Sequence, residues 1–226
     1  STLVRQLALW LPAGMADPTS AARQDVAERL GSWLHVVEGI QLHAAQASVA
    51  AAGEAASRRP PRRPSAELHA SLRAELDRVR GVLAHAIRSS PVHKPDPNDL
   101  DTELALFHQR LGDQQRRMEM SVDALRHHVR QQLAQSTPDM AQLAALDAVM
   151  DGFFGGREQR LLATLPSFLK ARFIALRQEA ALSRAPDTPD DLGWLRTFTA
   201  EFEQTLLAEL DLRLQPVTGL IESLHP

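Results

Sequence analysis

Apolar side chains recur every three or four residues along most of the chain, the spacing that places them on one face of an α-helix. One of the longest stripes runs from Leu104 through Val122 to Leu133. No run of alternating or β-branched residues competes with this pattern, so no strand is expected. The pattern predicts an all-α fold, an elongated antiparallel bundle of about five to six helices with coiled-coil-like packing.

Two proline-rich connectors interrupt the helical pattern, at residues 58–64 and 89–98. Proline lacks a backbone N–H and clashes with the preceding helical turn, so each connector ends a helix. A long helix is expected to start near Asp99, and Thr137 with Pro138 is expected to form the N-cap and first position of the next helix. We expect one helical domain over residues 1–226, with the two connectors as alternative points of subdivision.

Gly152, Gly155 and Gly156 weaken the helix predicted after Pro138, since each costs about 1 kcal/mol relative to alanine. The apolar phase around them is kept only if the helix runs through, so a continuous helix is predicted and a break is the alternative. Pro166 is expected to kink this helix, and Pro216 to bend the last helix into a short tail.

Stripe positions are expected to form the core because they recur at i, i+3 or i+4. The residues expected to be largely buried are Leu30, Trp33, Val37, Leu72, Leu76, Val79, Leu125, Val129, Leu146, Leu161, Phe173 and Phe202.

The composition argues against several classes of protein, including disulfide-linked, strongly basic and membrane-spanning proteins. Hydrophobic residues make up 44% of the 226 residues, enough for a real core, whereas aromatic residues make up 4%. The absence of cysteine excludes a disulfide framework and thiolate chemistry, and it agrees with a cytoplasmic location. A formal net charge of -3 gives no bulk attraction to nucleic acid, and no apolar run approaches the ~20 residues that a membrane span needs. A soluble, cytoplasmic protein is expected.

The residue patterns of catalysis and metal binding are missing from the sequence. The nucleophile elbow, the P-loop and the dinucleotide-binding glycine pattern do not occur. A di-iron bundle needs two Glu-x-x-His motifs, and only Glu222 to His225 matches. The adjacent His127 and His128 would point about 100° apart on a helix. We therefore expect no enzyme activity, no metal, no cofactor and no small-molecule substrate.

Arginines gather in two places, within the first connector and along the helix that begins near Asp99. The first group lacks aromatic residues for base stacking and is held extended by prolines, so an exposed connector is its simplest interpretation. Acidic residues on neighbouring helices could neutralise the second group. The candidate interaction residues are Arg58, Arg59, Arg62 and Arg63, and Arg116, Arg117, Arg126 and Arg130.

Two stretches, Ala-Ala-Leu-Asp-Ala-Val-Met at residues 144–150 and Arg-Glu-Gln-Arg-Leu-Leu-Ala-Thr-Leu-Pro at 157–166, resemble a family of uncharacterised all-helical bacterial proteins classed as a domain of unknown function. Residues 27–34 and 107–133 are similar to the same family. The resemblance covers nearly the whole chain and supplies no activity or catalytic residue. It implies genes encoded beside stator-type proton-channel and peptidoglycan-binding envelope proteins, and hence an accessory role in an envelope-spanning complex.

Together these observations predict a non-enzymatic helical scaffold or adaptor with a protein partner, with self-association into a homo-oligomer also open. The alternative is a peripheral protein that binds anionic membrane or nucleic acid through Arg58–Arg63 and the Arg116–Arg130 face.

Overall fold

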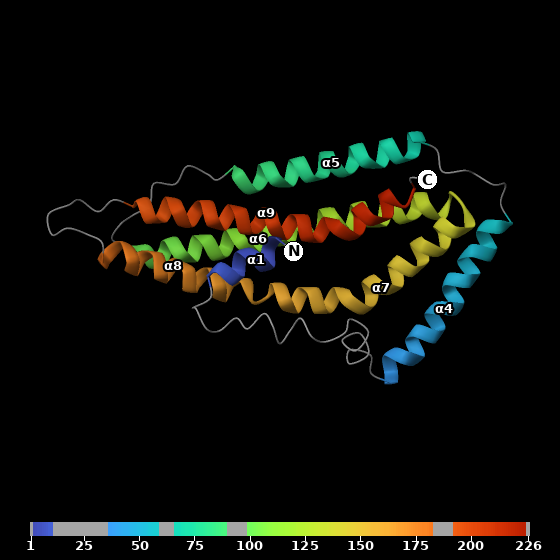
Figure 1. Ribbon diagram of the computed structural model, residues 1–226, viewed down its shortest axis with the longest axis horizontal. Coiled ribbons are helices and arrows are strands. Elements are labelled where there is room, and N and C mark those ends of the chain that lie inside the picture. Colours follow the sequence, from blue (N-terminus) through green and yellow to red (C-terminus); the bar gives the residue numbers. More distant parts are fainter. Residues whose placement is uncertain (1, 11–35, 59–65, 90–98, 183–191, 225–226) are drawn as a thin grey trace. The chain divides into compact units, whose positions relative to one another are not determined.

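The computed structural model describes residues 2–10, 36–58, 66–89, 99–182 and 192–224, which contain seven helices and no strand (Figure 1). These helices alone exceed about 65% of the chain, against a base rate of roughly one third, so the all-α prediction is confirmed. The helices are α1 (Thr2–Leu9), α4 (Val36–Ser57), α5 (Ala66–Arg88), α6 (Leu100–Ala134), α7 (Pro138–Leu162), α8 (Leu165–Leu182) and α9 (Gly193–Glu222).

Local capping explains where α6 and α7 begin. Asp99 precedes α6 and accepts hydrogen bonds from the backbone N–H of Thr102 at 3.2 Å and from its hydroxyl at 2.7 Å. The hydroxyl bond, followed by the backbone bond, lowers the pKa of Asp99, as expected for a carboxylate at a helix N-terminus. Thr137 precedes α7, and its hydroxyl accepts a bond from the N–H of Met140 at 3.3 Å. Both predicted starts are confirmed.

The helix that the sequence predicts to continue beyond Leu162 is divided into α7 and α8 by a turn at Ala163 and Thr164. The Thr164 carbonyl accepts bonds from the N–H groups of Ser167 and Phe168, so it begins α8. Pro166 lies in the first turn of α8, where a missing N–H costs no helical bond. The predicted kink is therefore a break, which is one reason why the count exceeds five to six.

Pro216 lies inside α9, which continues to Glu222. The last helix, which the sequence predicts to bend at Pro216 into a short tail, therefore does not end there. The ring removes the bond that the Leu212 carbonyl would otherwise receive. Leu214, Val217, Leu220 and Ile221 are all buried on either side of it, so packing holds the helix together across the proline.

Helix α7 passes through Gly152, Gly155 and Gly156 without a break, as the phase of its apolar residues predicts. Gly152 is exposed, and a Cβ added there would meet no other atom within 4 Å. The three glycines therefore lower the helix propensity of this segment. No neighbouring atom comes close enough to require a glycine at position 152.

We expect Gly152→Ala to raise the free energy of unfolding by about 0.5–1 kcal/mol, because alanine restricts the unfolded chain and fits the helix. Urea denaturation followed by far-UV circular dichroism measures the change. Gly53→Ala is the matched control, because its Cβ would lie 2.8 Å from Cγ of Gln142 and must displace that side chain. A loss of stability in Gly152→Ala would contradict the open space around Gly152.

The chain forms two compact units, each built from three segments. The first comprises Ser1–Trp10, Arg73–Arg126 and Arg157–Thr218. The second comprises Leu11–Leu72, His127–Gly156 and Gly219–Pro226. Helices α5, α6, α7 and α9 each contribute residues to both units.

The core of the first unit is centred on one face of α9. Phe198, Phe202 and Leu206 are fully buried there. Phe198 makes edge-to-face contacts with Phe107 of α6 and Phe173 of α8, at centroid distances of 4.9 and 5.1 Å. Such geometry adds to the burial of apolar area, so the aromatic residues hold α6, α8 and α9 together despite their low number.

The predicted core is largely confirmed where its side chains are described. Leu72, Leu76, Leu125, Val129, Phe173 and Phe202 are buried. Val79 is half-buried. Leu146 is 44% exposed, so its predicted burial is wrong. Leu30 and Trp33, and the side chains of Val37 and Leu161, lie outside the described part of the chain.

Candidate functional site

Arg130, one of the candidate interaction residues, lies in an internal ion-pair cluster of the second unit. Its Nε donates to Asp147 at 2.6 Å and its Nη2 donates to Asp151 at 2.6 Å, which joins α6 to α7. Burial lowers the pKa of Arg130, but the bonds to Asp151 and Asp147 outweigh that effect and the pKa is raised. Arg130 therefore stays charged and is engaged by its own chain.

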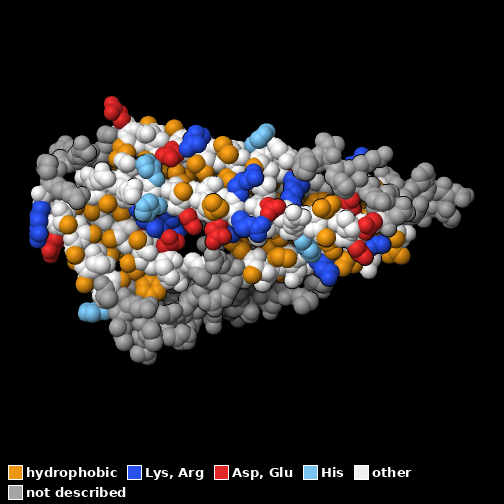
Figure 2. Space-filling view, turned by 180° about the vertical axis from the view of Figure 1, so that it is seen from behind, with side chains coloured by type: hydrophobic (Ala, Val, Ile, Leu, Met, Phe, Trp, Pro, Cys, Tyr) orange, Lys and Arg blue, Asp and Glu red, His pale blue; other side chains and the backbone are white. Residues whose placement is uncertain are grey.

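The remaining candidate arginines have different surroundings where the structure describes them. Arg116 and Arg117 are exposed on α6, and Arg116 pairs with Asp113 one turn earlier. Arg126 is half-buried on α6, one turn before Arg130. Arg58 is exposed after the end of α4, and Arg59, Arg62 and Arg63 lie outside the described residues. On the face shown in Figure 2, basic side chains are interspersed with acidic ones.

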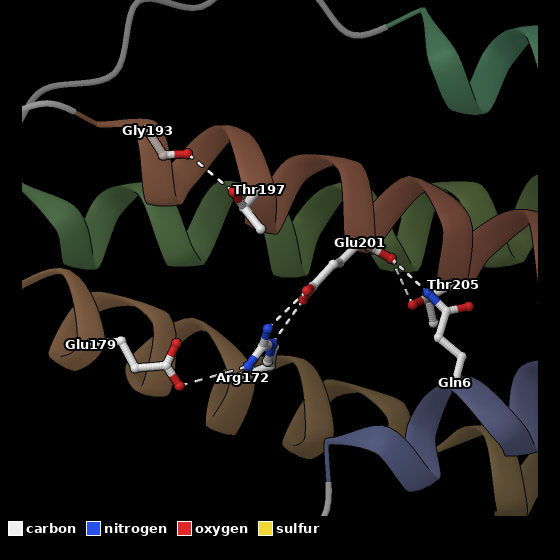
Figure 3. A network of polar contacts seen from close by, with 7 residues as sticks. All are labelled: Gln6, Arg172, Glu179, Gly193, Thr197, Glu201 and Thr205. Carbon is white, nitrogen blue, oxygen red and sulfur yellow. Dashed lines mark hydrogen bonds and ion pairs between the residues drawn. The ribbon is translucent and has the colours of Figure 1, made fainter.

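A second cluster joins α8 to α9 in the first unit (Figure 3). Arg172 donates two hydrogen bonds of 2.8 Å to the carboxylate of Glu201, and Glu179 lies 4.0 Å from its other nitrogen. The bond to Glu201 raises the pKa of Arg172 against the opposite effect of burial. The Glu201 carbonyl accepts bonds from Gln6 of α1 at 3.3 Å and from Thr205 at 2.8 Å. This cluster therefore connects three helices.

A third cluster is centred on Glu209 of α9, whose side chain is fully buried. Arg213 contacts its carboxylate through Nε at 2.9 Å and Nη2 at 2.8 Å. Gln115 of α6 donates to both carboxylate oxygens, at 3.3 and 3.1 Å. A buried charge needs such partners to avoid a large desolvation cost, so this carboxylate is neutralised in place.

Arg110 of α6 has three roles in the same unit. It donates to the carbonyl of Ile87 in the last turn of α5, it lies 3.5 Å from Glu203, and its guanidinium stacks 5.3 Å from the Phe202 ring centroid. Gln114 donates to the preceding α5 carbonyl, Ala86, at 3.2 Å. These bonds supply partners for carbonyls that a helix leaves open at its C-terminus.

The outer face of α7 differs from these polar clusters. We use this name for Leu143, Leu146, Met150 and Phe153, which follow one another at spacings of three, four and three residues. Leu146 is 44% and Met150 38% exposed, and the other two are half-buried. A second stripe around the helix carries the buried Ala141 and Ala144, and the two carboxylates that bind Arg130. Between residues 141 and 153, the buried apolar residues of α7 are thus alanines, whereas its two most exposed apolar side chains, Leu146 and Met150, are large.

Sequence reasoning missed the outer face because it assigns large apolar residues to the core. The signal that could have revealed it is the second stripe, Ala141, Ala144 and the two aspartates, which also follows helical spacing. An α-helix with two such stripes can pack on two sides.

The described residues contain no group of three or more His, Cys, Asp or Glu side chains placed to hold a metal ion. The expectations of no metal, no cofactor and no enzyme activity stay predictions. Within the same residues, none of the helices combines the length and apolar character that crossing a bilayer requires.

These features define an all-α protein whose helices are joined by internal ion pairs and which carries an exposed apolar stripe on α7. The chain belongs to the family described as Protein of unknown function (DUF3348), which matches residues 1–226. The resemblance to a family without an assigned activity is thereby confirmed. No curated protein and no solved structure matches the chain.

Proposed function

We propose that this protein is a non-enzymatic helical adaptor whose protein partner docks on the outer face of α7. The observation that carries this proposal is the exposure of Leu146 and Met150 within a stripe of heptad-like spacing. Contact between such a stripe and a second apolar stripe removes both from water, and this is the driving force of helix pairing.

The chemistry of the face points to an amphipathic helix as the docking element. A helix presenting apolar residues at i, i+3, i+4 and i+7 would match the four large side chains of the outer face. Asp147 and Asp151 are turned toward Arg130, so they contribute little charge to this face. Binding should therefore depend on apolar contact and be only weakly sensitive to salt.

An association with an envelope-spanning membrane complex is the finer form of this proposal. It rests on the family resemblance and its implied gene neighbours. In that setting the adaptor would work on the cytoplasmic side and contact a helical segment of a membrane component. Homo-oligomerisation through the same face would bury the same apolar side chains.

We expect Leu146→Ser combined with Met150→Ser to reduce recovery of the partner at least tenfold in affinity capture from cells that naturally produce the chain. Polar side chains would remove the apolar area that drives docking. Quantitative mass spectrometry of the captured proteins, at about 0.1 and about 0.5 M salt, measures both the loss and its salt dependence.

The matched control is Val82→Ser combined with Ile174→Ser, because both side chains are exposed apolar residues of the first unit. Partner recovery should be unchanged in this control. Equal recovery by the outer-face variant and the wild type would reject the proposed docking face.

A second proposal, binding of anionic membrane or nucleic acid, is favoured by the exposure of Arg58 and Arg117. The engagement of Arg130 and Arg116 by acidic residues weighs against it. Co-sedimentation with vesicles containing phosphatidylserine distinguishes the two proposals, since binding through arginines would be lost at high salt.

A further inference from the structure

The less exposed side of α4 carries mostly small residues. Among the α4 residues whose side chains are described, those that are not fully exposed are Ala45, Val49, Ala52, Gly53 and Ala56. They recur at spacings of three and four, apart from Gly53, which neighbours Ala52, so they occupy one side of the helix. We call them the α4 small-residue stripe. Such a stripe allows the backbone of a second helix to approach closely.

Helix α4 approaches α7 at Gly53, in the second unit. A Cβ added to this glycine would lie 2.8 Å from both Cγ and Cδ of Gln142, a distance that real Cβ atoms do not show. Gln142 lies next to the outer face, about 20° around the helix from the position of Phe153. In Figure 1 the end of α4 lies near the start of α7, the two helices have opposite chain directions, and they diverge toward the start of α4.

The contact defines the antiparallel register that the two helices would have if they packed along their length. With Gly53 opposite Gln142, one further turn places Val49 opposite Leu146, and the next places Ala45 opposite Met150. The two most exposed large side chains of the outer face would thus meet two smaller side chains of α4, Val49 and Ala45. Large residues set against small ones fill the space between closely packed helices.

We propose that α4 closes over the outer face of α7 in this register and thereby competes with the protein partner for it. The contact at Gly53 acts as the pivot, and Ala45 and Val49 cover Met150 and Leu146 when α4 is closed. The structure holds the open arrangement, in which the outer face is accessible. This inference rests on the proposed function, because it describes how access to the same docking face is regulated.

Engineered cysteine pairs test the register directly, because the natural chain contains no cysteine. Val49→Cys with Leu146→Cys should form an intramolecular disulfide at least ten times faster than Ala51→Cys with Leu146→Cys under mild oxidation. Ala51 is exposed and lies on the opposite side of α4 from Val49. Ala45→Cys with Met150→Cys is a second pair that should behave as the first.

Non-reducing electrophoresis and peptide mapping of the monomer separate the outcomes. A fast intramolecular disulfide in both matched pairs supports closure. Equal rates for the matched and control pairs, or disulfides formed mainly between two chains, overturn it. Circular dichroism before oxidation confirms that each variant is folded.

Thiol labelling gives an independent measure of how far α4 covers position 146 of α7. Leu146→Cys should react with iodoacetamide at least five times faster after Ala45→Asp and Val49→Asp are added, because the charges prevent closure. Ala148→Cys, an exposed position on another side of α7, should not change its rate. An unchanged rate at position 146 overturns the proposal.

The two proposals can fail separately. The disulfide and labelling tests use no partner, so a negative result leaves the capture experiment unaffected. Conversely, closure can be observed even if the outer-face variant still captures its partner.

Discussion

Replacing Arg213 by alanine is expected to lower the free energy of unfolding by about 3–5 kcal/mol. The side chain of Glu209 is fully buried, and Arg213 supplies the charge that compensates it through contacts of 2.8 and 2.9 Å. Without Arg213 the carboxylate keeps its neutral donor, Gln115, but loses its counter-ion. Guanidinium denaturation followed by far-UV circular dichroism measures the difference from the wild type.

Two control variants separate the buried charge from the loss of side-chain volume. Glu209→Leu combined with Arg213→Met should recover most of the stability, since no charge is left buried. Arg78→Ala should change stability by less than about 0.5 kcal/mol, because its pair with Glu75 is on the surface. A loss below about 1 kcal/mol for Arg213→Ala would mean that water reaches Glu209.

Replacing Phe198 by alanine is expected to cost about 3–5 kcal/mol, the range for removing a buried aromatic side chain. Phe198 is fully buried and contacts Phe107 and Phe173 edge to face, so its removal leaves a cavity among three helices. Chemical denaturation measures the loss, and the near-ultraviolet circular dichroism signal should weaken as the aromatic packing loosens.

The matched control for the aromatic core is Phe198→Leu, which keeps most of the apolar volume. It should cost less than Phe198→Ala, because it loses ring contacts but leaves a smaller cavity. A similar cost for the two variants would show that edge-to-face geometry, and not volume, dominates this site.

Much of the fold could be predicted because its signals are local. Asp99 and Thr137 bind backbone N–H groups within the next turn, so their capping role is visible in a few residues of sequence. The sequence predicts a kink at Pro166, whereas the structure has a break before it. Whether a proline ends a helix or bends it depends on the packing around it, which a local pattern does not contain.

The ion-pair clusters could not be predicted because each depends on the register between two helices. Arg130 reaches Asp147 and Asp151, 17 and 21 residues away, and Arg172 reaches Glu201, 29 residues away. A shift of one residue in either helix would turn these side chains by about 100°. The general expectation that acidic neighbours neutralise the α6 arginines was available from sequence, but their identity was not.

Leu146 shows why the size of a side chain does not by itself predict its burial. Its stripe has the correct period for a core helix, and leucine is among the residues most often buried. The buried side of α7 instead uses Ala141 and Ala144. Period therefore predicts that a face packs against something, but not which of two faces packs within the same chain.

The way α5 ends also limits how its length can vary. Its last carbonyls, at Ala86 and Ile87, meet donors from α6 that are 28 and 23 residues further along the chain. One residue inserted between Leu76 and Leu83 would advance the helix end by about 1.5 Å and rotate it by about 100° relative to the packed part of the stripe. The carbonyls would then no longer accept hydrogen bonds from Arg110 and Gln114. Alternatively, if the helix end kept its position, the buried leucines of α5 would rotate out of the core. The number of residues in α5 is thus fixed by its contacts at both places. A deletion or insertion in this helix is harder to accommodate than most substitutions.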